Sequence, residues 1–497
     1  MTISGRTIAK NASVLMISQV ITWGLTFLVT IFLSRYLGPQ GVGQLQLAAS
    51  LWSIVGVIAA LGMDTLLTKE VARSPSRMSE LIGTTLVLRT MIYMFGALGM
   101  AAYVQMAGYP AQTVSVIWIT GLAGLIGHLK DTYDSSLKGL ERMEYTSLAV
   151  IASIALLTFL RIPMLLFGYG VIPIAVVAII ANIASFGVLF YFSQKFYLCK
   201  LTVNWHLVHS VLAASLPYFL VSVGIVLYHQ VDTVIISLLA DEKTIGWYGA
   251  AAQLYGTLLF IPSVFVTALF PALSRAYTGS REASQRLAQK SMNLLILISV
   301  PVGLGIAVIA NQLVVLLFGA AFANSGPVLA IRGILLILTY VNMLLGFLLI
   351  SMDRQKAWAV AMLIATLATI PLDLILVPWT VKNFGNGALG GAISFAFTEV
   401  GITTAGFILL PSGTFGWENM KVAVRMILAG GVMVGATWFV RNAFILIPIT
   451  VGAVTYIGMI ATLHAVPKED LDFLVRIGAS FFQRLRSHHA RAVEVKG

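Results

Sequence analysis

Long apolar stretches, separated by short polar segments, dominate the sequence from end to end. Fourteen of these stretches hold about 20 mostly apolar residues, enough as a helix to cross a bilayer core of about 30 Å. They lack the residue-by-residue alternation of membrane β-strands. The pattern therefore predicts an all-α polytopic membrane protein with about 14 transmembrane helices. The predicted helices cover approximately residues 12–33, 42–63, 82–106, 112–137, 144–168, 171–192, 212–239, 245–271, 288–309, 326–350, 357–379, 387–410, 420–440 and 443–463.

Positive charge is distributed asymmetrically over the segments that connect these helices. With the N-terminus inside, 24 of the 31 Lys and Arg residues fall on the inner side and four on the outer side. Lys and Arg favour cytoplasmic loops, so this distribution predicts a multi-pass protein of the cell (inner) membrane with cytoplasmic N- and C-termini. The net charge of +12 then reflects topology and contact with anionic headgroups, and no nucleic-acid partner is expected.

Two parts of the sequence resemble each other at a spacing of 203 residues. Gly43 and Gly246 coincide in this alignment, together with four further identities. A second similarity pairs residues 137–142 with residues 349–354. We therefore expect two facing, pseudo-symmetric six-helix bundles, which are typical of transporters that work around a central cavity. The expected parts are residues 1–205, residues 206–412, two further helices over 413–465, and a cytoplasmic amphipathic tail over 466–497.

The sequence carries no pattern that indicates an enzyme. It contains no Gly-Lys pair and hence no P-loop, and its close histidine pairs lack the companions of a metal site. Cys199 is the only cysteine, which excludes an intramolecular disulfide. The short connections leave no room for a soluble catalytic domain. We expect no enzymatic activity, no cofactor and no metal, although a membrane ligase or polymerase of sugar repeats is the competing class.

Three arginines, Arg89, Arg161 and Arg332, fall within predicted helices. A charged residue at the bilayer centre costs about 2.5–3.5 kcal/mol on insertion scales, so each should face water or a partner. Arginine keeps its proton, and its guanidinium group matches two phosphate oxygens at once. These residues predict a cationic cavity for a phosphate-bearing substrate. The alternative is structural pairing with an acidic residue: Asp64, Asp232, Asp373 or Glu399.

Acidic residues within the helices are candidates for ion coupling. Asp232 lies in the last third of the seventh predicted helix and is a candidate cation or proton site. His229, three residues earlier on the same face, is a candidate proton relay. Asp373 and Glu399 are further candidates in the eleventh and twelfth helices. The alternative role for Asp232 is a structural hydrogen bond to a neighbouring helix.

Several motifs resemble those of a known family. Residues 32–43 (FLSRYLGPQGVG) are similar to the end of the first span in polysaccharide flippases of the multidrug/oligosaccharidyl-lipid/polysaccharide exporter superfamily. Asp232 together with residues 246–251 resembles that family's connection between the seventh and eighth spans. Residues 269–275 resemble its close of the eighth span. Other similar segments are residues 317–329, 376–378 and 387–393, whereas residues 381–384 lengthen a loop that is shorter in relatives.

The resemblance implies two six-helix lobes in a V shape plus two C-terminal helices. It also implies an O-antigen-type flippase that moves a polyprenyl-diphosphate-linked oligosaccharide to the outer leaflet by alternating access, for cell-surface polysaccharide biosynthesis. Expected partners are this lipid-linked oligosaccharide, membrane lipids, a polysaccharide polymerase and glycosyltransferases. The alternatives are a flippase for the peptidoglycan precursor and a drug/cation antiporter of the same superfamily.

Overall fold

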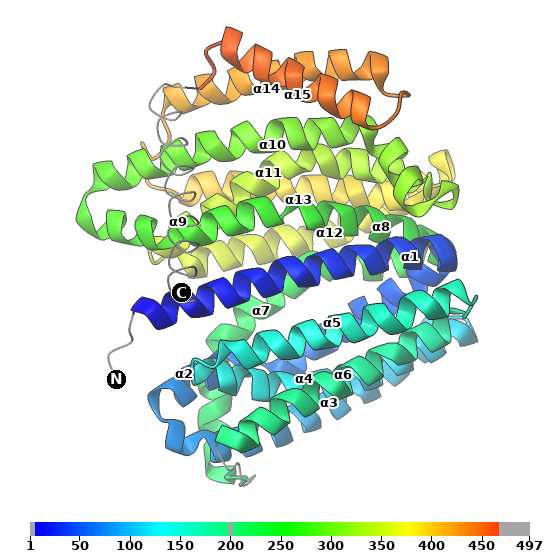
Figure 1. The fold of residues 1–497 in the computed structure, drawn as a ribbon, viewed down its shortest axis with the longest axis vertical. Coiled ribbons are helices and arrows are strands. Elements are labelled where there is room, and N and C mark those ends of the chain that lie inside the picture. Colours follow the sequence, from blue (N-terminus) through cyan, green and yellow to red (C-terminus); the bar gives the residue numbers. More distant parts are fainter. Residues whose placement is uncertain (1–4, 197–201, 467–497) are drawn as a thin grey trace, which may run out of the picture. The chain divides into compact units, whose positions relative to one another are not determined.

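Helices form all of the regular structure in residues 5–196 and 202–466, the part of the chain that the computed structural model describes (Figure 1). Each of the fourteen predicted stretches coincides with a helix or with part of one, which confirms the all-α prediction. Among the described residues, twelve helical stretches are long and apolar enough to cross a membrane. The number is lower than fourteen because the first two predicted spans run together and because the last helix has only 17 residues.

In chain order the α-helices are α1 (Gly5–Ala60), α2 (Met63–Arg73), α3 (Met78–Ala107), α4 (Ala111–Gly139), α5 (Met143–Leu166), α6 (Val171–Phe196), α7 (Trp205–Leu239), α8 (Glu242–Leu258), α9 (Phe260–Gly279), α10 (Arg281–Phe318), α11 (Ser325–Ser351), α12 (Gln355–Phe384), α13 (Gly387–Leu409), α14 (Trp417–Val440) and α15 (Leu446–Thr462). Two short 3-10 helices, η1 (Pro75–Arg77) and η2 (Ala320–Phe322), lie in connections.

A kink at Gly38 separates the two predicted spans that α1 contains. Gly38 has φ 66° and ψ −178°, a conformation that glycine adopts because it has no Cβ. Pro39 follows directly and disfavours helical geometry in the residue before it. The Gly-Pro pair thus ends the first span and begins the second.

The eighth predicted span is interrupted, because α8 ends at Leu258 and α9 begins at Phe260. Pro262 lies in the first turn of α9 and has no N–H group to donate to the carbonyl oxygen of Leu258. The break therefore lies where proline removes a helical hydrogen bond.

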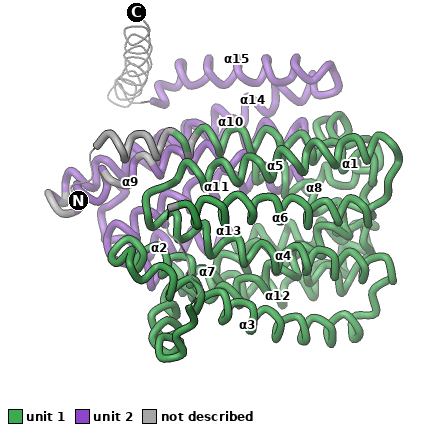
Figure 2. Tube along the Cα trace, turned by 60° about the horizontal axis from the view of Figure 1, so that its bottom comes forward, with its two compact units in different colours: residues 1–257, 313–328, 359–398 green, residues 258–312, 329–358, 399–497 purple. Residues whose placement is uncertain are grey.

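The chain divides into two compact units (Figure 2). Unit 1 comprises residues 1–257, 313–328 and 359–398, and unit 2 comprises residues 258–312, 329–358 and 399–497. In unit 1, α4, α5 and α6 pack against one another and against α1, and in unit 2, α14 packs against α15. The division into lobes at residues 205 and 412 stays a prediction. Residues 467–497 of the predicted tail lie outside the described residues.

An apolar core in unit 1 joins α2, α3, α4, α5 and α6. Tyr133 of α4 lies at its centre, 1% exposed, with its ring edge against Phe186 and Phe190 of α6. In a bilayer, van der Waals contacts between such side chains stabilise the helix packing, because lipid tails are as apolar as the side chains themselves. The other buried members are Leu67, Val71, Met78, Leu81, Ile82, Leu137, Ala149 and Leu189.

Equivalent turns follow α4 and α11, at the positions of the second sequence similarity. Glu141 has φ 60° and Asp353 has φ 58°, so an acidic residue adopts the left-handed conformation in both turns. In each turn the N–H of the following arginine bonds to the carbonyl oxygen five residues before it, at 2.9 Å and 2.8 Å. This is the hydrogen bond of a helix-terminating Schellman motif. The similarity in sequence therefore has a counterpart in local structure.

Candidate functional site

Two buried carboxyl groups, those of Asp232 and Asp373, meet inside unit 1. Asp232 lies on α7 and is 5% exposed, and Asp373 lies on α12 and is fully buried. The two groups are close enough to interact electrostatically, and Ser394 of α13 lies beside Asp373. Neither oxygen of Asp373 receives a hydrogen bond of ordinary geometry within the described residues. Three helices thus converge on a pair of like charges in a buried position.

Hydroxyl groups surround this carboxyl pair. Tyr248 of α8 donates its hydroxyl to the carboxylate of Asp232. One helical turn before Asp373, Thr369 forms a hydrogen bond of 2.6 Å with Thr398, which lies one turn after Ser394. Facing turns of α12 and α13 therefore present oxygen atoms to each other. Carboxylate and hydroxyl oxygens are the ligands that hard cations prefer, and a bound cation or proton would relieve the repulsion between the two acids.

The side chains of His229 and Asp232 differ in exposure. Its side chain is exposed, whereas Asp232 is buried. The ring of His229 packs edge-on against Tyr228, with centroids 4.9 Å apart. The proton relay between His229 and Asp232 stays a prediction, in which the exposed ring would take up protons for the buried carboxyl group.

Glu399 of α13 occupies a separate position, in unit 2. It is fully buried, and its Oε2 atom accepts hydrogen bonds from Thr339 Oγ1 at 2.7 Å and Asn342 Nδ2 at 2.9 Å. Both donors lie on α11, one turn apart. A carboxylate that two donors hold in this way links two helices, which is the structural role that the sequence left open for such acids.

Arg89 of α3 forms an ion pair with Asp64 of α2, within unit 1. The guanidinium is fully buried, and its Nη2 atom lies 2.6 Å from Asp64 Oδ1. Its Nη1 atom donates to Thr132 Oγ1 at 3.2 Å and to the carbonyl oxygen of His128 at 3.3 Å. Ser135 also donates to Asp64. Arg89 therefore has the structural role that was the alternative for these arginines, which is pairing with an acidic residue.

Arg161 and Arg332 lie on different helices and in different units. Arg161 is five residues from the end of α5, about 8 Å, and not at the middle of the span. Its Nε atom donates to the carbonyl oxygen of Ile174 at the start of α6, at 3.3 Å. Arg332 lies on α11, seven residues after its first residue, and is 6% exposed. Within unit 1, Arg161 and Arg89 thus have different partners, and Arg332 belongs to unit 2.

Sequence reasoning missed Tyr248 and the serine and threonine residues of α12 and α13. Tyr248 lies inside the segment 246–251 that was singled out for its resemblance, although no role was assigned to it. Ser394 and Thr398 are four residues apart, as are Thr369 and Asp373, so each pair shares a helix face. That spacing of polar residues in apolar helices is the signal that locates them.

The chain matches known proteins in sequence. A family model described as "Polysaccharide biosynthesis protein" matches residues 8–277, more than half of the chain. The "Probable low-salt glycan biosynthesis flippase Agl15" of Haloferax volcanii is 22% identical over 398 residues, which cover 79% of this chain and 82% of that protein.

The fold is similar to those of solved membrane transport proteins. An inward closed conformation of the lipid II flippase MurJ superposes with a TM-score of 0.71 at 15% identity, covering 90% of this chain and 98% of MurJ. An inward-facing multidrug resistance MATE transporter of the MOP superfamily gives a TM-score of 0.62 at 14% identity, covering 84% and 94%. The helices described above therefore have a fold similar to those of MurJ and of this MATE transporter.

Proposed function

The chain belongs to the family of polysaccharide biosynthesis proteins, and on this premise we propose that it flips a polyprenyl-diphosphate-linked oligosaccharide from the cytoplasmic to the outer leaflet. Membership of this family is the observation that carries the proposal. The archaeal relative supports it, because that protein bears the name of a glycan biosynthesis flippase and aligns over most of both chains. The proposed location is the cell membrane, with both termini in the cytoplasm, as the distribution of Lys and Arg predicts.

The arginines within the helices support a diphosphate as part of the cargo. A diphosphate that leaves the aqueous headgroup region needs cationic donors, and guanidinium groups bind phosphate oxygens in pairs. We assign this role to Arg161 and Arg332. The Nε atom of Arg161 is used by Ile174, and the guanidinium has further donors at Nη1 and Nη2. Arg89, which Asp64 already neutralises, has a supporting role in this proposal.

The carboxyl pair supports coupling of transport to a cation gradient. Two carboxylates side by side in a buried position repel each other unless a proton or a metal cation lies between them. Binding of a cation would draw α7 and α12 together, and its loss would favour their separation. A cation gradient would then bias the two conformations of the transporter. We propose Na⁺ or H⁺ as the coupling ion at Asp232 and Asp373.

A leaflet assay tests the proposed cargo. Purified protein is reconstituted in liposomes that contain a polyprenyl-diphosphate oligosaccharide, and loss of lectin-accessible sugar from one leaflet is followed with and without a Na⁺ or pH gradient. The expected result is protein-dependent translocation that the gradient accelerates. Asp373→Asn should abolish the acceleration, and Glu399→Gln is the matched control in a carboxylate that donors already satisfy.

Parallel cargoes distinguish the competing functions. Faster movement of a lipid-linked peptidoglycan precursor than of oligosaccharide carriers would assign the protein to that substrate. Efflux of a drug-like organic cation without glycolipid movement would assign it to antiport and overturn the proposal.

A further inference from the structure

Two backbone segments of unit 1 make a reciprocal contact. Both lie at helix ends that the predicted topology places on the outer side of the membrane. One is the start of the second limb of α1, residues 39–46, and the other is the start of α8, residues 242–249. A methyl group built on Gly43 would overlap the carbonyl oxygen of Glu242 and lie 3.0 Å from the nitrogen of Gly246. A methyl group built on Gly246 would overlap the carbonyl oxygen of Pro39. The two segments are thus as close as backbones can be.

The contact follows the repeat in the sequence. At the spacing of 203 residues, Pro39 corresponds to Glu242 and Gly43 corresponds to Gly246. Gly43 contacts the carbonyl of Glu242, and Gly246 contacts the carbonyl of Pro39, so the same contact is made in both directions. Gln46 has Gly249 as its counterpart, and the two are also in contact: a methyl group built on Gly249 would lie 3.0 Å from the Gln46 side chain. Residues that contact their own counterparts lie on the axis that relates two copies. The contact therefore joins the first repeat to the second at this axis.

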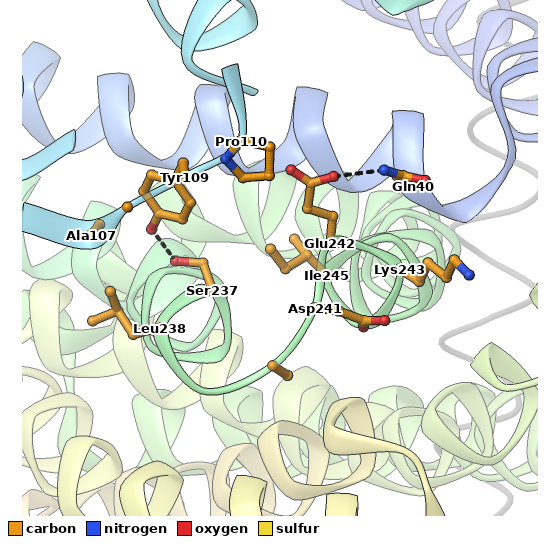
Figure 3. Close-up of a pocket in the computed structure, with 12 residues that line it drawn as sticks. Gln40, Ala107, Tyr109, Pro110, Ser237, Leu238, Asp241, Glu242, Lys243 and Ile245 are labelled. Carbon is orange, nitrogen blue, oxygen red and sulfur yellow. Dashed lines mark hydrogen bonds between the residues drawn. The ribbon is translucent and has the colours of Figure 1, made fainter. Parts of the chain in front are cut away.

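Side chains reinforce the contact around the carboxylate of Glu242. Its Oε2 atom accepts hydrogen bonds from Gln40 Nε2 at 3.1 Å and from Gln44 Nε2 at 2.9 Å. Thr113, at the start of α4, donates its hydroxyl to the other oxygen. Figure 3 shows the bond from Gln40 to Glu242. Three donors from the first repeat thus depend on one acceptor from the second.

A second bond lies across the adjacent cavity. Tyr109, in the connection between α3 and α4, forms a hydrogen bond of 2.8 Å with Ser237 of α7 (Figure 3). Burial raises the pKa of Tyr109 above its usual value, so its hydroxyl keeps its proton. The cavity between this bond and Glu242 has a volume of about 390 Å³ and is lined in part by the exposed side chains of Asp241 and Lys243.

We propose that this reciprocal contact, with Gly43 and Gly246 at its centre and Glu242 as its acceptor, is the latch that closes the outer end of the transport pathway. The inference rests on the proposed transport function. For cargo to leave on the outer side, the first and second repeats must separate here, which breaks the three bonds to Glu242. A methyl group at either glycine cannot be accommodated by a change of rotamer, because it meets backbone atoms. Alanine at these positions therefore favours the open latch.

Thiol labelling tests the latch without any cargo. In a Cys199→Ser background, Ser50→Cys places a thiol seven residues beyond Gly43 along α1, about 10 Å deeper. Ser50 is fully buried and bonds to Gln230 of α7, so it lies between the repeats. Gly43→Ala and Gly246→Ala should each increase labelling by an impermeant maleimide from the outer side about ten-fold. Gly256→Ala is the control, because a methyl group there meets no atom within 4 Å.

Two further variants keep the test decisive if an alanine variant does not fold. Glu242→Gln keeps the shape of the side chain but removes one acceptor, and it should also increase labelling. Linking the thiols of Gln40→Cys and Glu242→Cys with a short bis-methanethiosulfonate, which forms a disulfide with each thiol and releases sulfinate, should stop transport. Reduction of these disulfides should restore it.

The outcomes separate the latch from the cargo. Unchanged labelling in folded Gly43→Ala, Gly246→Ala and Glu242→Gln proteins, or full transport by the linked protein, would overturn the latch. Increased labelling in a protein that moves no glycolipid would support the latch and overturn the proposed cargo instead.

Discussion

Tyr340 donates its hydroxyl to the carbonyl oxygen of Leu258 at 2.7 Å. In a regular helix this carbonyl would accept from residue 262, which is a proline. The same relation recurs in unit 2, where Tyr456 donates to the carbonyl oxygen of Leu297 at 3.2 Å, four residues before Pro301. In both places a tyrosine hydroxyl replaces the N–H that proline lacks, and lipid-embedded backbone has few other donors.

Replacing either tyrosine by phenylalanine should therefore destabilise the protein. Tyr340→Phe leaves the Leu258 carbonyl without this donor, and the expected loss is about 1–3 kcal/mol in the free energy of unfolding. Tyr456→Phe should cost less, because its bond is longer. Thermal unfolding in detergent measures both. Tyr36→Phe is the control, since the Tyr36 side chain is half exposed and retains its stacking on Phe32; an equal loss in the control would contradict the interpretation.

Cation binding should stabilise the wild-type protein through Asp232 and Asp373. At constant ionic strength, Na⁺ in 100-fold excess over its dissociation constant should add about 2.7 kcal/mol to the free energy of unfolding. If protons occupy the pair instead, acidification should have this effect and Na⁺ should have none. Asp232→Asn and Asp373→Asn should remove the dependence on the ion, and Glu399→Gln should keep it. Thermal melts over a series of Na⁺ concentrations and pH values distinguish the two ions. If stability still depends on the ion in both Asp variants, the ion does not bind at Asp232 and Asp373.

Removing one partner of the Arg89–Asp64 ion pair should reduce the stability of the protein more than replacing both partners. Asp64→Asn leaves a fully buried guanidinium without its counter-charge, and a loss of about 3–5 kcal/mol in stability is expected. Because Asp64 is 44% exposed, water should reduce this loss toward the lower end of the range. Arg89→Met combined with Asp64→Asn should be closer to wild type than Asp64→Asn alone. A double-mutant cycle on unfolding measures the coupling, and simple additivity would contradict it.

Arg161→Ala and Arg332→Ala should weaken transport while expression and folding stay near normal. Loss of a charged hydrogen bond to a diphosphate oxygen corresponds to about 1.5–3 kcal/mol, or more than ten-fold in transport rate at low substrate concentration. Lysine at either position should restore part of the rate, because it keeps the charge but not the paired geometry. Initial rates in the leaflet assay, normalised to folded protein, provide the measurement. Wild-type rates in both alanine variants would exclude these arginines as diphosphate ligands.

The helices could be predicted from the sequence because each long apolar stretch is a local signal. The two turns at residues 141 and 353 could be recognised as equivalent from the sequence, because a short local motif determines each turn. The break between α8 and α9 was marked only by Pro262, and whether a proline kinks or interrupts a helix depends on the donor that replaces its N–H. Here that donor is Tyr340, 82 residues away.

The side-chain partnerships could not be predicted, because they depend on packing between helices far apart in sequence. Asp232 and Asp373 were both named as candidates, but nothing in the sequence indicated that they meet. Asp64 was one of four acids considered for Arg89, and helix packing selected it. His229 shows the limit of helical periodicity. Three residues place it about 60° from Asp232 around the helix, which is enough to separate an exposed side chain from a buried one.

The contact of Gly43 with Gly246 also bears on how such a molecule can arise. A single six-helix chain with a glycine at this position would present the same surface to a second copy of itself, and the copies would dimerise through one self-complementary patch. Fusing two such copies preserves the contact without inventing a second surface. Once fused, the halves are free to diverge around the shared glycines, as Pro39 and Glu242 have. In a symmetric dimer, a carboxylate in one copy would also be present in the other. In the fused chain, one half alone can carry the carboxylate that accepts the hydrogen bonds.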